Sequence, residues 1–249
     1  IENQKITETK TNLTDLLHLL SRISHHHHYT DFFSKYEKLI IMIKDKILEF
    51  YTNKEIFNIF KCNKRVLLFL IRENILIFDE DVARAIVKDK YINRYYPQYF
   101  APEIKPYIQE EWIPKVKNEF NEENKWIKEI DGDLPKNFYE NREIGENEHE
   151  LSNIIRQDLI EDFIVYVKSK NYDLNSKIPT SIYETNSLLI VRDSFYNDKY
   201  NSSLIQYAAF FGSVQIFKYL QLNQVELNSS LWTFAVHGGN PEIIHILED

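Results

Sequence analysis

The sequence predicts an all-α fold, and three observations support that prediction. Glycine and proline are scarce, with 5 and 7 residues among 249, so few positions interrupt a helix. Strict alternation of apolar and polar residues, the pattern of a half-buried strand, is rare. Apolar residues instead recur at steps of three and four, which places them on one face of a helix. We therefore expect an N-terminal helical domain over residues 1–135, followed by stacked helix pairs, a helical solenoid, over residues 136–249.

Composition and charge argue against several classes of partner. The net charge is −8 and 27% of the residues are charged, whereas nucleic-acid binding depends on clustered Lys and Arg. The same balance argues against an anionic membrane surface, and no apolar run reaches the roughly 18 residues that span a bilayer. The single cysteine, Cys62, rules out an internal disulfide and a cysteine-based zinc site. We expect a cytoplasmic protein that contacts neither nucleic acid nor membrane.

Helix starts follow one another in the first half of the chain. An apolar stripe over Thr30–Phe50 predicts one long helix. Thr52 and Glu55 have the spacing of a capping box, in which each side chain satisfies a backbone amide of the other residue. Asn63 is placed to cap the next helix, and Asp79 opens the one after it. These local signals predict a succession of short helices.

Two segments divide the chain. Three prolines between Arg94 and Ile108 predict a series of turns or brief helices, because proline lacks an amide donor and restricts the residue before it. A longer helix that carries Val116 and Ile130 is expected to follow. The segment DGDLPKN, Asp131–Asn137, combines Gly, Pro and two Asp residues and predicts the domain boundary.

Short helix pairs are expected after this boundary. Asn147 and Asp158 each precede a Glu by three residues, which is the spacing of a helix cap. A long connection, residues 169–187, follows the second of these helices. The run Leu188–Val191 fits either a strand or a buried turn of helix, and both stay open. Residues 193–203 are predicted to be a polar linker.

Two glycine-containing stretches repeat one pattern. AAFFGSVQIFKYL, Ala208–Leu220, and AVHGGNPEIIHIL, Ala235–Leu247, align when Gly212 is placed over Gly239, an offset of 27 residues. Each unit is expected to form a short helix, a tight turn at the glycine and a second helix, because glycine allows the positive φ that ends the first helix. Such a pair cannot bury its apolar residues alone, so we expect it to stack on neighbouring pairs.

The segment SLIQYAAFFGSVQIFKYLQLNQVELN, Ser203–Asn228, resembles an ankyrin repeat. Ala208 and Gly212 are among the positions that match the family's pattern. The segment departs from the pattern at Ser203–Gln206, which replaces the usual T-P-L-H, and at Gln224, where the family has a glycine. The offset of 27 residues is also shorter than the family's repeat of about 33. We therefore expect the projecting hairpin between repeats to be missing.

More narrowly, the chain resembles a protist family in which degenerate ankyrin-like repeats follow a helical domain of unknown function. The segments that carry this resemblance are GENEHELSNIIRQD, SIYETN, QYAAFFGS and VHGGNPEIIH. The resemblance implies a scaffold or adaptor that binds other proteins, with no catalytic residue and no cofactor. It also implies further repeats downstream. Because the chain begins at Ile1 and stops at Asp249 directly after an apolar helical pattern, we expect a piece of a longer protein.

The sequence leaves three functions open. The first is an ankyrin-type adaptor that binds one protein through its concave face. The second is a structural component of a large cytoskeletal or axonemal, microtubule-associated assembly, which would place the protein on the cytoskeleton. The third is an enzyme with an unrecognised pocket between the domains. The chain contains no G-x-S-x-G, P-loop, H-E-x-x-H or G-x-G-x-x-G motif, so we expect a protein that is not an enzyme.

Phe210, Phe211 and His237 are the candidate protein-binding residues. The two phenylalanines occupy positions that are polar and exposed in the ankyrin pattern. Either the linker 178–203 or the first domain covers them, or they form an aromatic contact site for a partner. For the histidine run His25–His28, a solvated loop or cap, a metal or pH-sensing role and an expression tag stay open. No metal site is predicted there, because consecutive residues of a helix point in different directions.

Overall fold

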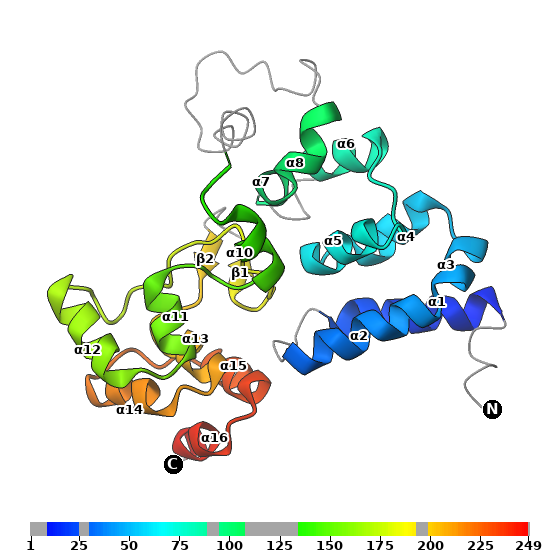
Figure 1. Ribbon diagram of the computed structural model, residues 1–249. Coiled ribbons are helices and arrows are strands. Elements are labelled where there is room, and N and C mark those ends of the chain that lie inside the picture. Colours follow the sequence, from blue (N-terminus) through cyan, green and yellow to red (C-terminus); the bar gives the residue numbers. More distant parts are fainter. Residues whose placement is uncertain (1–8, 25–29, 89–94, 108–133, 193–198, 249) are drawn as a thin grey trace. The chain divides into compact units, whose positions relative to one another are not determined.

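The structure, a computed structural model, describes most of the chain: residues 9–24, 30–88, 95–107, 134–192 and 199–248 (Figure 1). The regular structure of these residues is helical apart from one antiparallel pair of short strands, β1 (Ile190–Arg192) and β2 (Lys199–Asn201), and one isolated bridge, so the all-α class is confirmed. The predicted helix with Val116 and Ile130, and the run His25–His28, lie outside the described residues.

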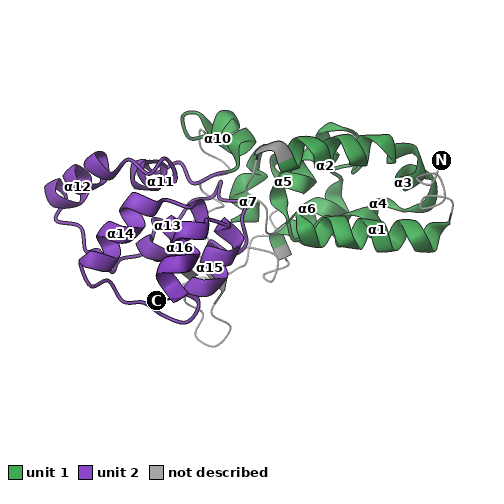
Figure 2. Ribbon diagram, turned by 90° about the horizontal axis from the view of Figure 1, so that it is seen from below, with its two compact units in different colours: residues 1–145 green, residues 146–249 purple. Residues whose placement is uncertain are grey.

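Packing divides the chain into two compact units, Ile1–Gly145 and Glu146–Asp249, which Figure 2 distinguishes by colour. Each unit has its own apolar core. We describe the two units separately.

Unit 1 consists of short helices around one apolar core. In the first helix, Leu13, Leu17 and Leu20 recur at steps of four and three and are all buried. This spacing places them on one face of the helix. Among the described residues of unit 1 the helices are α1 (Lys10–Ile23), α2 (Thr30–Met42), α3 (Lys44–Phe50), α4 (Asn53–Phe60), α5 (Lys64–Arg72), α6 (Glu80–Lys88), α7 (Tyr96–Tyr99), α8 (Ala101–Ile104), the 3₁₀ helix η2 (Lys105–Tyr107) and α10 (Phe138–Ile144).

The stripe Thr30–Phe50 forms two helices, not the single helix that was predicted. The backbone breaks at Ile43, with φ −105° and ψ 6°. Ile40 before the break and Ile47 after it are both fully buried. The apolar stripe therefore continues across the break, and residue spacing does not distinguish this arrangement from one helix.

The caps predicted at Thr52 and Asn63 in unit 1 are confirmed. Thr52 and Glu55 form the capping box at the start of α4. Asn63 Oδ1 accepts two backbone hydrogen bonds, at 3.1 and 3.2 Å, at the start of α5. The described part of the proline-containing segment 94–108 forms the brief helices α7, α8 and η2, as expected.

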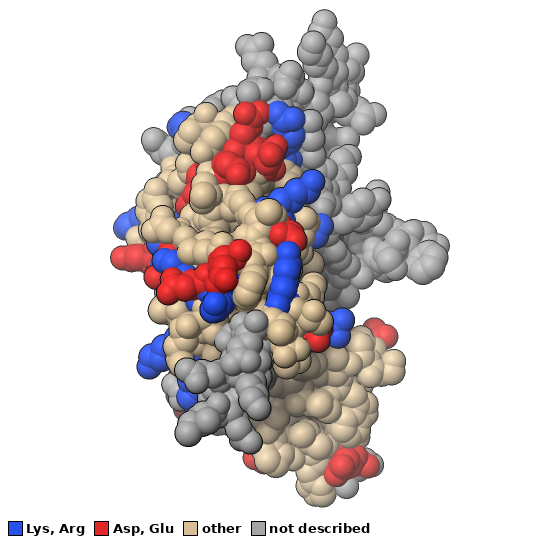
Figure 3. Space-filling view, turned by 90° about the vertical axis from the view of Figure 1, so that its right-hand side faces the viewer, with Lys and Arg blue, Asp and Glu red and all other residues tan. Residues whose placement is uncertain are grey.

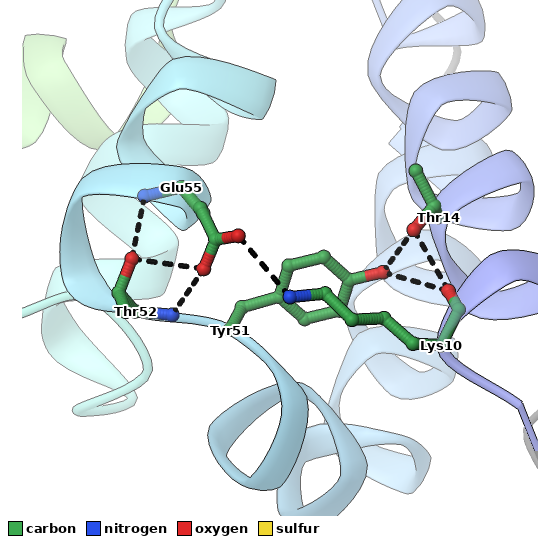
Figure 4. A network of polar contacts seen from close by, with 5 residues as sticks. All are labelled: Lys10, Thr14, Tyr51, Thr52 and Glu55. Atoms are coloured by element: carbon green, nitrogen blue, oxygen red, sulfur yellow. Dashed lines mark hydrogen bonds and ion pairs between the residues drawn. The ribbon is translucent and has the colours of Figure 1, made fainter.

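The capping box belongs to a polar network between α1 and α4, which Figure 4 shows. Lys10 Nζ lies 3.1 Å from Glu55 Oε1 and 5.0 Å from the centre of the Tyr51 ring. The Tyr51 hydroxyl and Thr14 Oγ1 are 2.7 Å apart. Glu55 also accepts from the Thr52 amide at 2.7 Å. A backbone amide, a hydroxyl and an ammonium group thus hold one carboxylate.

Glu55→Gln is expected to destabilise unit 1 in a pH-dependent way. Hydrogen bonds from Thr52, first from its backbone amide and then from its hydroxyl, and the Lys10 ammonium lower the pKa of Glu55 from 4.5 to about 2. A carboxylate with a lowered pKa stabilises the fold above its unfolded pKa, and this contribution is lost as the pH falls through the folded pKa. The difference in urea midpoint between the wild type and Glu55→Gln should therefore shrink as the pH falls from 4.5 towards about 2.

Glu49→Gln is the control for this measurement. Glu49 is exposed and lies 2.6 Å from Lys46 on the surface of α3. Exposed ion pairs of this kind contribute little, so the control should unfold close to the wild type at every pH. A difference between Glu55→Gln and the wild type that does not change with pH would contradict the role of the network.

Helix α10 belongs to unit 1, so the packing boundary lies after Gly145 and not at residue 135. Arg142 is buried and donates two hydrogen bonds to Glu103, at 2.8 and 2.6 Å. It also donates to the Tyr99 carbonyl at 3.0 Å. Gly145 then ends α10 with φ 70°. Composition could not show this boundary, because Arg142 and Glu103 are distant in the sequence.

Unit 2 is built mainly from helices that pack side by side. Helix α13 packs against α11 and α15, and α14 packs against α12 and α16. The helices of this unit are α11 (Glu150–Arg156), α12 (Ile160–Ser169), α13 (Leu204–Phe211), α14 (Val214–Leu222), α15 (Leu231–Gly238) and α16 (Pro241–Glu248).

The connection between α12 and α13 is part of the packed unit. Strand β1 begins at Ile190, so the second half of the run Leu188–Val191 is a strand. Its partner strand, Lys199–Asn201, lies within the predicted polar linker and corrects that prediction. The Ile178 amide donates to the Ser202 carbonyl at 2.9 Å. Strand pairing satisfies backbone groups between distant residues, which a local pattern does not reveal.

Helices α5, α12 and α14 end in the same way. Each is followed by a non-glycine residue in the left-handed region: Asn74 (φ 52°), Asn171 (φ 46°) and Gln224 (φ 59°). The next amide then bonds back to the helix, as between Val225 and the Leu220 carbonyl at 3.2 Å. Gln224 thus takes the conformation for which the ankyrin pattern has a glycine.

Candidate protein interface

The helix pairs α11–α12, α13–α14 and α15–α16 share one turn geometry. A left-handed residue ends the first helix of each pair: Asp158 (φ 53°), Gly212 (φ 70°) and Gly239 (φ 62°). The predicted positive φ at the two aligned glycines is therefore confirmed. The sequence predicted that Asp158 caps α12. This prediction is wrong, because the N-cap residue of that helix is Leu159.

Side chains of these turns bridge neighbouring pairs. The Asp158 carboxylate accepts from the amides of Gln215 and Ile216, both at 3.0 Å, and so caps α14 and not its own helix. Asn240 Nδ2 donates to the Gly212 carbonyl at 3.2 Å. The Oδ1 atom of the same asparagine caps α16, as predicted. The turns thus connect each pair to the next.

A partly buried polar cluster lies between α11 and α13. Arg156 Nε lies 3.0 Å from Glu146 Oε2, and its guanidinium donates to the Asn147 carbonyl and the Tyr207 hydroxyl, both at 2.8 Å. Burial, followed by the charge of Glu184, raises the pKa of Tyr207. Asn147 was predicted to cap α11, but the N-cap residue there is the histidine two positions later. The Arg156 guanidinium therefore connects Glu146 and Asn147, the first residues of unit 2, to Tyr207 of α13.

Phe210 and Phe211 differ in burial. Phe210 is 0% exposed and belongs to the core of unit 2. Phe211 is partly exposed, and its ring lies 4.7 Å from the Tyr207 ring and 5.9 Å from the Arg156 guanidinium. Because α13 lies between α11 and α15, Phe210 is a core residue and does not present a surface to a partner. This corrects its place among the candidate binding residues.

His237 lies on the exposed side of α15. Together with Trp232, Thr233 and Val236 it forms a surface that we call the α15 outer face. Trp232 is 39% and Val236 is 61% exposed, while His237 is partly exposed. The other side of the helix is buried and holds Leu231, Phe234, Ala235 and Gly238.

The repeat gives the α15 outer face a counterpart on α13. At the offset of 27 residues, its four residues correspond to four buried residues of α13: Ile205, Gln206, Ala209 and Phe210. That side of α13 receives α15. A Cβ added at Gly238 would lie 2.2 Å from the Ala209 carbonyl oxygen, and Gln206 Nε2 donates to Ser230 Oγ at 2.8 Å. The α15 outer face therefore corresponds to the side of α13 that packs against the next helix pair.

Gly238 is the residue of this region whose role the sequence reasoning missed. The backbone of α15 approaches the backbone of α13 at this position, so any side chain would overlap with α13. The available signal was the doubled glycine of VHGGN, from which only Gly239 was assigned a role.

We also searched the described residues for a metal site, a membrane-spanning helix, a free cysteine and a charged surface patch. Among them, no group of three or more His, Cys, Asp or Glu residues is placed to hold a metal ion. No helix in the same part of the chain is long and apolar enough to cross a bilayer. Cys62 is exposed and free. On the face drawn in Figure 3, Lys and Arg side chains lie among Asp and Glu side chains.

Comparison of the chain with protein-family models, curated proteins and solved structures finds no significant match. The structure itself defines the class of this protein, which is a helical protein with two compact units. The ankyrin resemblance stays a prediction that rests on the residues and turns of unit 2.

Proposed function

We propose that this protein is a non-enzymatic adaptor that binds another protein through unit 2, a short solenoid of ankyrin type. The α15 outer face carries the proposal. It exposes apolar side chains at positions whose counterparts on α13 are buried under the next helix pair. Burial of exposed apolar area is favourable, and tryptophan is among the residues that dominate the binding energy of protein interfaces.

The turns support this proposal, because they tie consecutive helix pairs of unit 2 together. The side chains of Asp158 and Asn240 join consecutive helix pairs through hydrogen bonds to the backbone of the neighbouring pair. Lys218 of α14 forms an ion pair with Glu242 of α16. A preformed surface loses less conformational freedom on binding than a flexible one.

Val236→Asp is expected to abolish partner binding while the protein stays folded. Val236 is 61% exposed, so the free protein tolerates the carboxylate, whereas an apolar interface would bury it without a partner. The experiment purifies the wild type and the variant from the cells that make the protein and quantifies the proteins recovered with each. A stoichiometric partner of the wild type should be recovered at least about tenfold less with the variant.

Val165→Asp is the matched control. Val165 is 66% exposed and lies on α12, away from the α15 outer face. The same substitution there should leave partner recovery unchanged. Equal recovery with both variants, or equal loss with both, would contradict the assignment of the interface.

A further inference from the structure

The first helices of the pairs in unit 2 can be compared position by position, with the left-handed turn residues Asp158, Gly212 and Gly239 as the reference. Each first helix has a forward side, at the positions that correspond to the α15 outer face. On α11 its completely buried residues are Leu151, Ser152 and Ile155. On α13 it is buried where α15 packs and consists of Ile205, Gln206, Ala209 and Phe210. Only on α15 does the forward side lie exposed among these helices.

The rear side of each first helix lies opposite and shows the reverse order. On α15 it is buried and consists of Leu231, Phe234, Ala235 and Gly238. On α13 it consists of Leu204, Tyr207, Ala208 and Phe211, of which all but the last are buried. On α11 the same positions hold three exposed polar residues and one isoleucine: Glu150, Asn153, Gln157 and Ile154. The described series of pairs therefore starts with a mainly polar side and finishes with an apolar one.

The second helices show the same difference. At the offset of 27 residues, Ile244 and Leu247 of α16 correspond to Phe217 and Leu220 of α14. Phe217 and Leu220 are completely buried, whereas Ile244 and Leu247 are partly exposed. The accessible apolar surface therefore extends from α15 onto α16, which follow α13 and α14 in Figure 1.

One hydrogen bond recurs wherever a pair packs on the pair before it. Ser213 Oγ donates to the Ile155 carbonyl at 2.5 Å, and Asn240 Nδ2 donates to the Gly212 carbonyl at 3.2 Å. In both cases a polar residue after the turn bonds to the end of the preceding first helix. The corresponding acceptor on the last described pair is the carbonyl of Gly239.

We propose that the partner presents an antiparallel helix pair, which packs on α15 and α16 as these helices pack on α13 and α14. This inference rests on the proposed function and names the partner's chemistry. The first helix of the partner's pair carries glycine or alanine where it crosses Val236, as Gly238 does at Ala209. A serine or asparagine after its turn donates to the Gly239 carbonyl.

The same observations exclude other occupants. The rear side of α11 in a second copy is mainly polar, and the rear side of its α15 is buried in its own unit. An extended peptide binds by adding a strand to a sheet edge, whereas the surface here belongs to two helices. A helix pair is the element that covers the same positions in both preceding cases.

The test uses an extended protein, in which a second copy of residues 223–249 follows Asp249 and stands in for the partner's helix pair. This length keeps the offset of 27 residues, and phenylalanine replaces the tryptophan of the added copy. We expect the fluorescence of Trp232 to move to shorter wavelength than in the wild type, because its indole leaves water. Subtracting the spectrum of a Trp232→Phe variant of each protein removes the emission of the other two tryptophans.

The matched control is the extended protein with leucine in the added copy at the position that corresponds to Gly238. Leucine prevents the close approach of the helices, so the fluorescence of Trp232 should stay as in the wild type. The extended protein should also recover at least about tenfold less of the stoichiometric partner than the wild type, because the added pair occupies the interface. The leucine control should recover as much as the wild type.

Four results would overturn the inference. They are unchanged Trp232 fluorescence in the extended protein, the same shift with glycine and with leucine, undiminished partner recovery by an extended protein whose Trp232 is shifted, and a wild type that sediments as a dimer through α15. A wild type that recovers no partner contradicts the adaptor proposal instead. The fluorescence test needs no partner, so the two failures are distinguishable.

Discussion

Gly238→Ala should destabilise unit 2 more than any other single methyl addition in α15. The new Cβ would lie 2.2 Å from the Ala209 carbonyl oxygen and 2.8 Å from the Phe210 carbonyl oxygen. Backbone atoms cannot turn away as a flexible side chain can, so α15 must shift from α13. Overpacking of a core typically costs about 1–3 kcal/mol, and we expect a loss near 3 kcal/mol in the free energy of unfolding, measured by urea unfolding followed by circular dichroism.

Two neighbouring substitutions show whether this loss comes from the close approach. Gly239→Ala adds the same methyl group at φ 62°, where the left-handed conformation costs about 1–2 kcal/mol. Val236→Ala, at an exposed position, should change the stability by less than about 0.5 kcal/mol. If Gly238→Ala unfolds at the same urea concentration as Val236→Ala, the contact between the backbones of α13 and α15 does not hold the pair together.

Phe210→Ala and Phe211→Ala should have clearly different effects, although the two residues are adjacent. Phe210 is completely buried, and removing a buried phenylalanine ring costs about 3–5 kcal/mol. Phe211 is partly exposed, and its replacement removes mainly its ring contacts with Tyr207 and Phe210 and its contact with Arg156. We expect a loss of about 1–2 kcal/mol for Phe211→Ala, because an aromatic or cation–π pair contributes about 0.5–1.5 kcal/mol.

Thermal and urea unfolding of the two single variants test this difference. Phe211→Ala should stay folded and keep its partner, because the proposed interface lies on α15. Equal destabilisation by the two substitutions would contradict the burial of Phe210. Loss of the partner by a folded Phe211→Ala variant would move the interface from α15 to α13.

The part of the fold that the sequence predicted depends on short-range chemistry. The capping box of Thr52 and Glu55 and the cap at Asn63 each involve residues two or three positions apart. The left-handed conformation of Gly212 and Gly239 is also a local property, because glycine has no Cβ and adopts a positive φ without steric cost. The helical class and these helix starts were therefore readable from the residues alone.

The parts that were wrong depend on contacts between distant residues. Asp158 has the spacing of a cap for its own helix, but its carboxylate bonds to α14. Arg142 extends unit 1 past the predicted boundary because Glu103 is its partner. A local pattern names a group that can form a hydrogen bond, but the fold decides which partner it meets.

The candidate interface was predicted only in part. His237 does lie on the α15 outer face, but Trp232 and Val236, which contribute its apolar area, were not identified. Their four-residue spacing is a helical signal that could have been found. Recognising it required knowing that the opposite side, with Phe234 and Gly238, is the buried one. That side is fixed by α13, which the sequence of α15 does not contain.

The bond between Asp158 and α14 also has a consequence for the order in which this chain folds. The first turn of α14 obtains two of its hydrogen-bond acceptors from a carboxylate that is 57 and 58 residues earlier in the chain. During synthesis, domains fold from the N-terminal side as they emerge, so Asp158 leaves the ribosome well before Gln215. Helix α14 therefore obtains this cap only when the turn between α11 and α12 lies beside it, so the start of α14 depends on a helix pair that is made earlier in the chain.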